Sequence, residues 1–100
     1  MLDLSKEQPP EEFLIPYLEE FLQRRVQELG QMRQANTSSD FPSIKKIAHN
    51  WAGVCAPYGF GALAEAAREI ERLAEERNES QVSELLLEIS DYLERKKSHL

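Results

Sequence analysis

Hydrophobic residues recur along most of this chain with the three- and four-residue spacing of amphipathic helices, and no segment alternates with the two-residue period of a strand. Four such stretches are separated by short breaks in which Asn, Ser, Asp, Pro and Gly gather. Four helices with short connections predict an all-α fold, an antiparallel up-down four-helix bundle. We expect residues 1–100 to form a single domain whose core lies between about residues 13 and 97.

The first stretch runs from about Pro10 to Gln34 and is interrupted by Pro16. Because proline is best tolerated in the first turn of a helix, we expect a short helical turn before Pro16 and a longer helix after it. Ile15 and Tyr17 either help to cap the bundle or extend toward a partner, and the same alternatives hold for two of the core positions, Leu14 and Leu18. The predicted buried positions of this stretch are Phe13, Leu14, Leu18, Phe21, Leu22, Leu29 and Met32.

The connection to the second helix is predicted to be a loop from Ala35 to Asp40, in which Asp40 or Ser39 accepts the free amide hydrogens of the next helix. The second helix is predicted to run from Phe41 to about Ala56. Its expected buried positions are Phe41, Ile44, Ile47, Ala48, Trp51 and Cys55.

The break at 57–59 (Pro-Tyr-Gly) separates the second helix from a third, predicted from near Phe60 to about Arg77. The fourth helix should follow a tight connection at 78–80, with Ser80 as its cap, and fray at Lys96 and Lys97. The expected buried positions of these two helices are Leu63, Ala66, Ala67, Ile70, Leu73 and Ala74, followed by Val82, Leu85, Leu86, Ile89 and Leu93.

The charge of the chain is acidic overall but unevenly distributed. A net charge of −6 argues against nucleic acid or an anionic membrane as the main partner. Between Asp40 and Glu65, however, there is no Asp or Glu, while Lys45, Lys46 and His49 all fall in that window. The surface around the histidine should therefore favour a negatively charged partner.

A single cysteine, Cys55, excludes an intramolecular disulfide and fits a reducing compartment. The chain has no run of about 18 apolar residues and no signal-peptide core, so we expect a soluble, cytoplasmic monomer. Cys55 and Trp51 both fall on the apolar stripe, which favours core positions, although a tryptophan can also sit at an interface rim. His99 is interpreted as a residue of the C-terminal tail, and one central histidine beside two lysines predicts no metal and no cofactor.

His49 is the residue with the most distinctive chemistry. It lies opposite the apolar stripe of the second helix, with Lys45 and Lys46 one turn earlier and three small residues, Ala52, Gly53 and Ala56, nearby on the same side. An exposed neutral imidazole is a nucleophile that can carry a phosphoryl group, and nearby lysines would offset its negative charge. Gly53 costs roughly 1 kcal/mol inside a helix, which close approach of the neighbouring helix or of a partner would explain.

The sequence around His49 resembles the histidine phosphotransfer (HPt) domains of two-component phosphorelays. The resemblance rests on the run IAHNWAG, which follows FPSIKK and precedes YGF. The family signature is a histidine, an apolar residue, two glycines and a leucine at fixed offsets. In this chain those positions are His49, Trp51, Gly53, Gly59 and Leu63. The flanking segments PYLEEFLQRR and LLLEISDYLERK also fit, so the resemblance extends from about residue 13 to 97.

The resemblance implies a mechanism. A response-regulator receiver domain would present an aspartyl phosphate, His49 Nε2 would attack it, and the group would then pass to a second receiver. Receiver domains and hybrid sensor kinases would be the partners, the receiver would hold Mg²⁺, and the module itself would have no enzymatic activity. Glu71 holds the position from which many members hydrogen-bond the histidine ring, unless it is an ordinary surface glutamate. Ala56, Arg68 and Arg72 would border the docking surface, unless the arginines form only a solvated face.

One residue departs from the family pattern. The lysine that usually lies three positions after the histidine, beside the phosphate, is Ala52 here. Lys45 and Lys46 could replace its charge, in which case the protein carries phosphate. The alternative is a degenerate module that binds a receiver or sensor kinase without carrying phosphate. An unrelated helical oligomerisation domain is a third interpretation, which would require a large exposed apolar patch.

Overall fold

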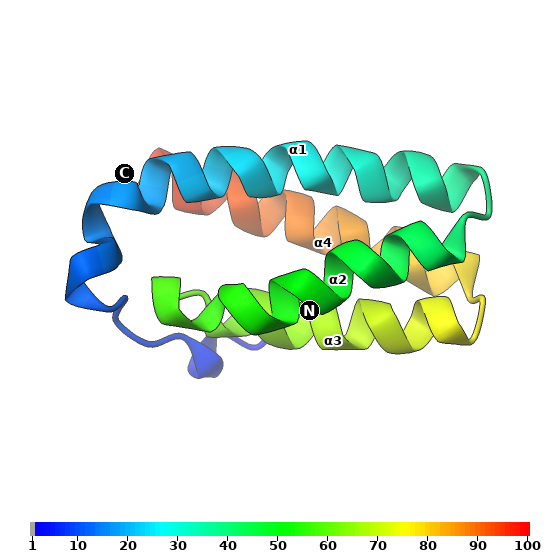
Figure 1. The fold of residues 1–100 in the computed structure, drawn as a ribbon, viewed down its shortest axis with the longest axis horizontal. Helices are drawn as coiled ribbons and strands as arrows, with labels where there is room; N and C mark the ends of the chain where they lie inside the picture. Colours follow the sequence, from blue (N-terminus) through cyan, green and yellow to red (C-terminus); the bar gives the residue numbers. More distant parts are fainter. Residues whose placement is uncertain (1) are drawn as a thin grey trace.

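Four helices pack side by side in antiparallel order in the computed structural model, which describes residues 2–100 (Figure 1). Within that range there is no β-strand, so the predicted all-α four-helix bundle is confirmed. Three short 3₁₀ helices complete the fold. The elements are η1 (Leu4–Lys6), η2 (Glu12–Tyr17), α1 (Leu18–Thr37), α2 (Phe41–Val54), η3 (Ala56–Tyr58), α3 (Gly61–Glu75) and α4 (Glu79–Ser98).

The connections α1–α2 and α3–α4 are built in the same way. Ser39 and Arg77 adopt left-handed backbone conformations, with φ of 55° and 56°. The amide of the next residue then reaches back along the preceding helix, from Asp40 to the Ala35 carbonyl and from Asn78 to the Leu73 carbonyl, both at 2.8–2.9 Å. These hydrogen bonds form Schellman motifs, which satisfy carbonyls that the helix end would leave free. Each connection therefore needs only three residues.

The helix that follows each connection is capped by the residue that closes the motif. The Asp40 carboxylate accepts from the Ser43 amide, which confirms Asp40 rather than Ser39 as the cap of α2. The Asn78 side chain accepts from the Gln81 amide, so the prediction of Ser80 as the cap of α4 was wrong. Asn78 fits this position because its short side chain reaches the free amides from a non-helical backbone.

The ends of several helices differ from the sequence predictions. α1 continues to Thr37, through residues predicted to be loop, because Asn36 is buried and donates from Nδ2 to the Glu79 carbonyl of α4 at 3.1 Å. α2 ends at Val54, and the next residues form η3 instead of a last helical turn. α3 begins at Gly61 and ends at Glu75, inside its predicted limits. α4 stays helical to Ser98, beyond the lysines at which fraying was expected.

The core is one continuous cluster between the four helices, and nearly all predicted buried positions belong to it or pack against it. Phe13 is the clear exception, because 69% of the residue is exposed. It lies in η2, whose 3₁₀ geometry has three residues per turn, so the α-helical spacing used in the prediction does not apply there. Ile15 and Tyr17 are also exposed, while Leu14 and Leu18 are half-buried. Tyr92 and Arg25 are buried residues that the sequence pattern did not identify.

A polar network crosses the core between α1 and α2. Trp51 is fully buried, as expected of a core residue, and its indole Nε1 donates to Glu28 Oε1 at 2.8 Å. The same oxygen lies 3.0 Å from Arg25 Nε, and the Arg25 guanidinium stacks over the Phe21 ring at 4.4 Å. A buried indole needs an acceptor and a buried cation needs an anion. Glu28 supplies both and so fixes the orientation of Trp51 in α2.

The N-terminal arm, residues 2–11, lies against the end of the bundle where α3 begins (Figure 1). The carbonyl of Lys6 occupies the space that a Cβ at Gly61 would need, only 2.0 Å away. Gly59 has a φ of +92°, and a Cβ there would lie 2.8 Å from the Gln8 carbonyl. Both glycines are therefore required by the arm, and Gly59 also by its left-handed backbone conformation.

Glu7 anchors this arm to two helices. Its carboxylate accepts hydrogen bonds from the buried Tyr92 hydroxyl and from the Ala62 amide at 3.3 Å, and it pairs with Lys96 Nζ at 3.0 Å. The N-cap residue of α3, Phe60, has no side chain that can cap the helix. Glu7 thus supplies both the capping acceptor and a negative charge at the positive end of the α3 dipole. Burial, followed by the Glu7 contact, raises the pKa of Tyr92.

We expect Glu7→Ala to lower the free energy of unfolding by about 1–3 kcal/mol, because it leaves the buried Tyr92 hydroxyl and the start of α3 without an acceptor. Chemical denaturation followed by circular dichroism measures this loss. Glu12→Ala, an exposed carboxylate just beyond the arm, is the matched control and should change stability by less than about 0.5 kcal/mol. Equal effects of the two substitutions would contradict an anchoring role for Glu7.

Candidate functional site

His49 lies midway along α2 with its ring in solvent, its side chain 79% exposed. The helix positions it there because the buried face of α2 consists of Phe41, Ile44, Ala48 and Trp51, which leaves His49 on the other side. The sequence prediction that the imidazole points outward is therefore confirmed by the geometry. A partner molecule can reach this ring without any movement of the bundle.

The imidazole is held by one contact from α3. His49 Nδ1 lies 3.1 Å from Glu71 Oε2. An ionised carboxylate can only accept a hydrogen bond, so Nδ1 must carry the proton in this contact. In a neutral ring the lone pair then resides on Nε2, and Nε2 becomes the nucleophilic nitrogen. The resemblance anticipated this position for Glu71, and the structure brings the two side chains together.

A salt bridge joins the same two helices one helical turn away from this contact. Lys45 on α2 pairs with Glu75 on α3. The hydrogen bond from Lys45 and then its charge lower the pKa of the Glu75 carboxyl, so this carboxylate is ionised near neutral pH. Residues four apart on a helix lie on the same face, with Cβ atoms about 5–6 Å apart. Lys45 is thus next to His49, but its charge is already engaged by Glu75.

These groups line one shallow hollow on the surface between α2 and α3, with a volume of about 530 Å³. Three cationic side chains, Lys45, Lys46 and Arg77, and two carboxylates, Glu71 and Glu75, face it together with His49. The segment between Asp40 and Glu65 contains no acidic residue, but in the structure α3 places two glutamates beside it. The hollow carries both signs of charge, with the positive sign in slight excess.

The remaining residues predicted for the site are arranged around this hollow in different ways. Lys46 is exposed and lines it, while Ala52 is half-buried one turn after His49, and Ala56 is exposed where η3 begins. Arg68 is exposed on α3. Arg72 is tied to two glutamates of its own helix end, Glu69 and, at 2.7 Å, Glu76. Those carboxylates raise the pKa of Arg72 and occupy its donors, which makes it less available to a partner than its exposure suggests.

Gly53 has no packing role in the bundle. A Cβ built at this position would meet no atom within 4 Å, because the residue is exposed on α2. Close approach of the neighbouring helix therefore does not explain this glycine, and that alternative was wrong. Approach of an outside partner stays a prediction.

The thiol of Cys55, possible metal-ligand clusters and possible membrane spans complete the description of the chain's chemistry. Burial raises the pKa of the Cys55 thiol to about 12, and the residue is fully buried, so it does not ionise near neutral pH. Among residues 2–100, no three His, Cys, Asp or Glu side chains are placed to hold a metal ion together. No helix in the described part of the chain is long and apolar enough to cross a membrane.

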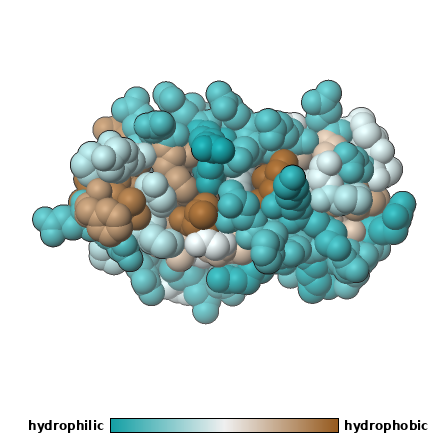
Figure 2. Space-filling model, viewed as in Figure 1, coloured by the Kyte–Doolittle hydropathy of each residue, from teal (hydrophilic) through white to brown (hydrophobic). Residues whose placement is uncertain are grey.

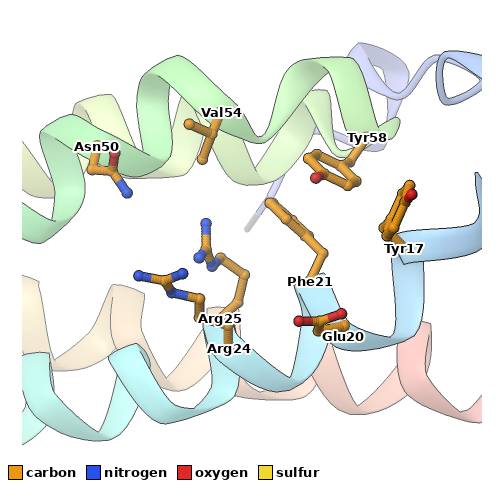
Figure 3. Close-up of a pocket in the computed structure, with 8 residues that line it drawn as sticks. All are labelled: Tyr17, Glu20, Phe21, Arg24, Arg25, Asn50, Val54 and Tyr58. Carbon is orange, nitrogen blue, oxygen red and sulfur yellow. The ribbon is translucent and has the colours of Figure 1, made fainter. Parts of the chain in front are cut away.

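A second groove, of about 420 Å³, lies on the other side of α2 against α1 (Figure 3). Figure 3 shows Phe21 and Arg25 of α1 pointing toward α2, while Tyr17 and Tyr58 close one end. The face seen in Figure 2 is mostly hydrophilic, with a large apolar cluster at the end of the bundle that carries η2 and η3 and smaller apolar spots nearer the middle. Asn50 lines this groove, so α2 exposes consecutive residues, His49 and Asn50, to the two hollows.

We expect the neutral His49 ring to exist mainly as the tautomer protonated at Nδ1, because Glu71 accepts that proton. The ¹⁵N chemical shifts of the ring in a long-range ¹H–¹⁵N spectrum distinguish the two tautomers. Glu71→Ala should increase the population protonated at Nε2, the form that free histidine favours. Glu65→Ala, on the same helix outside the hollow, serves as the control, and identical ring spectra for the wild type and Glu71→Ala would show that Glu71 does not hold the ring.

Comparison with known proteins identifies one family. A family model described as Hpt domain matches residues 16–99, which is most of the chain and includes all four α-helices. No curated protein and no solved structure gives a significant match. The N-terminal arm lies outside the matched region.

Proposed function

The chain belongs to the Hpt domain family, whose members are phosphocarrier modules of two-component signalling, and on this basis we propose that it relays a phosphoryl group through His49. The donor and acceptor would be aspartates of response-regulator receiver domains, including the receiver of a hybrid sensor kinase. This assignment of partners follows the family, because Hpt domains interact with receiver domains and kinases in phosphorelays.

The observation that supports the proposal most directly is the state of the His49 ring. It is 79% exposed, and Glu71 Oε2 lies 3.1 Å from its Nδ1. Phosphotransfer needs a nucleophilic nitrogen that a bulky protein partner can reach, with its lone pair free. Both conditions are met at Nε2, and Ala52 and Gly53, one turn on, leave space beside it.

The transfer step follows from this geometry. His49 Nε2 attacks the phosphorus of an aspartyl phosphate, the N–P bond forms, and the P–O bond to the aspartate breaks, so the aspartate leaves as a carboxylate. The proton on Nδ1 stays in place, and the phosphorylated ring carries a positive charge beside the Glu71 carboxylate, which stabilises it. Transfer to a second aspartate reverses these bond changes. The receiver would supply Mg²⁺ and its acidic residues, while this chain supplies the nucleophile and a docking surface.

Incubation with a phosphorylated receiver domain should place acid-labile, alkali-stable phosphate on the wild-type protein. His49→Gln should abolish this labelling, because glutamine has no nucleophilic ring nitrogen, and His99→Gln should leave it unchanged. Phosphate transfer is followed with radiolabelled receiver or by intact mass. Absence of label on the wild type with several receivers would refute phosphotransfer through His49.

A second function, receiver or kinase binding without phosphate transfer, is favoured by one specific observation. Ala52 replaces the lysine that the family usually places beside the phosphate, and Lys45, one of the two lysines that could replace its charge, is paired with Glu75. A degenerate module of this kind would accept no label, and its affinity for a receiver would be unchanged by the substitution His49→Gln.

Ala52→Lys separates the two functions quantitatively. If the site transfers phosphate but lacks one favourable charge, the added lysine should raise the transfer rate about three- to tenfold, as expected for one partly screened charge interaction of roughly 1 kcal/mol. Rapid-mixing measurements of receiver dephosphorylation give this rate. Gln81→Lys, which adds the same charge at an exposed position on α4, is the control. No change with Ala52→Lys would show that transfer does not depend on a cation at this position.

A further inference from the structure

Two cross-helix pairs join α2 to α3 on the exposed flank. Lys45 pairs with Glu75, and one turn along both antiparallel helices His49 contacts Glu71. All four side chains line the same hollow. Among the described residues that line it, Lys45 is the cation that lies one turn from His49 and is also held by a carboxylate of α3. Its position is therefore controlled by Glu75.

We propose that Glu75 is a positioning residue that withholds Lys45 from His49 and thereby sets how readily the ring accepts and keeps a phosphoryl group. This inference rests on the proposed function, because it concerns the phosphorylated state of the same histidine. In the unphosphorylated protein Lys45 neutralises Glu75. After phosphorylation Lys45 is shared between Glu75 and the new phosphoryl group.

The charges at the hollow explain the direction of the effect. A phosphoryl group carries about two negative charges near neutral pH, so it attracts a lysine more strongly than one carboxylate does. Glu71 and Glu75 line the same hollow as His49. Glu71 is compensated by the positive charge of the phosphorylated ring, whereas Glu75 loses part of its pairing with Lys45. Glu75 therefore opposes phosphorylation and favours onward transfer.

The lowered pKa of Glu75 is consistent with this role, because the carboxylate stays ionised throughout the neutral range. Of the other cations of the hollow, Arg77 is less suited to replace Lys45. Arg77 is stacked over the Phe41 ring, 5.2 Å from its centroid, about two helical turns from His49 along α2. Lys46 lines the hollow from the adjacent position on α2.

Phosphoramidate tests the inference without a receiver domain, so that docking does not contribute. In this reaction His49 Nε2 forms the N–P bond while the N–P bond of phosphoramidate breaks and ammonia leaves. Glu75→Gln removes the charge and frees Lys45, and we expect labelling to become about two- to fivefold faster and the phosphohistidine to hydrolyse more slowly. Lys45→Ala should have the opposite effect. Rates are followed by ³¹P NMR or intact mass.

Controls separate this role from a general loss of charge or of structure. Glu76→Gln also removes a carboxylate that forms an ion pair at the end of α3, 2.7 Å from Arg72, but it does not line the hollow, and it should leave the labelling rate unchanged. The acceleration by Glu75→Gln should shrink at about 1 M salt, where the Debye length is about 3 Å. In a double-mutant cycle, Glu75→Gln should have a much smaller effect once Lys45 is replaced by alanine.

The outcomes distinguish the inference from the function on which it rests. If the wild type accepts no acid-labile phosphate from phosphoramidate or from receivers, the proposed function fails. If the wild type is labelled but Glu75→Gln matches it or matches Glu76→Gln, the positioning role is wrong. A full effect of Glu75→Gln in the Lys45→Ala background would likewise overturn control through Lys45.

Discussion

The close packing of α2 against α3 is the constraint on which the site depends. α3 presents mainly alanines to the core, among them Ala64, Ala67 and Ala74, and α2 contributes Ala48, all buried. Small side chains let two helices approach closely, and the flanks of the helices then lie within reach of each other. Only for this reason can carboxylates of α3 contact His49 and its neighbouring lysine. Bulky residues at these positions would separate the helices and leave the histidine without a partner for Nδ1.

The sequence predicted the existence and order of the helices and the exposure of His49 because hydrophobic periodicity reports directly on which face of a helix is buried. It did not predict where the helices end. Asn36 is a poor helix former, yet it is helical because its side chain satisfies a carbonyl of α4. Phe13 was wrongly predicted to be buried, because that prediction assumed the α-helical period of about 3.6 residues and η2 is a 3₁₀ helix. Both errors arise where tertiary contacts or local geometry override propensity.

Interactions between distant residues lie outside what one sequence reveals. Glu7 and Tyr92 are 85 positions apart and are joined by a hydrogen bond that closes one end of the bundle. Lys45 and Glu75 are 30 positions apart. Their pairing means that the segment between Asp40 and Glu65, which has no acidic residue of its own, is not a purely cationic surface. Glu71 was anticipated only through the family resemblance, because nothing in the local pattern of α3 distinguishes it from the other glutamates of that helix.

The division of α2 into two faces separates stability from chemistry. Its buried face is fixed by Trp51, which is enclosed in the core and bonded to Glu28, while its exposed face carries His49 and the small residues after it. The alanine at position 52, half-buried one turn after the histidine, changes the charge beside the ring relative to the lysine that the family usually has there. Members of one family can therefore share this bundle and differ in how strongly they hold a phosphoryl group. Under the proposed function, surface charges from two helices would decide that strength in this chain, since the fold supplies the exposed ring but leaves its electrostatic surroundings free to vary.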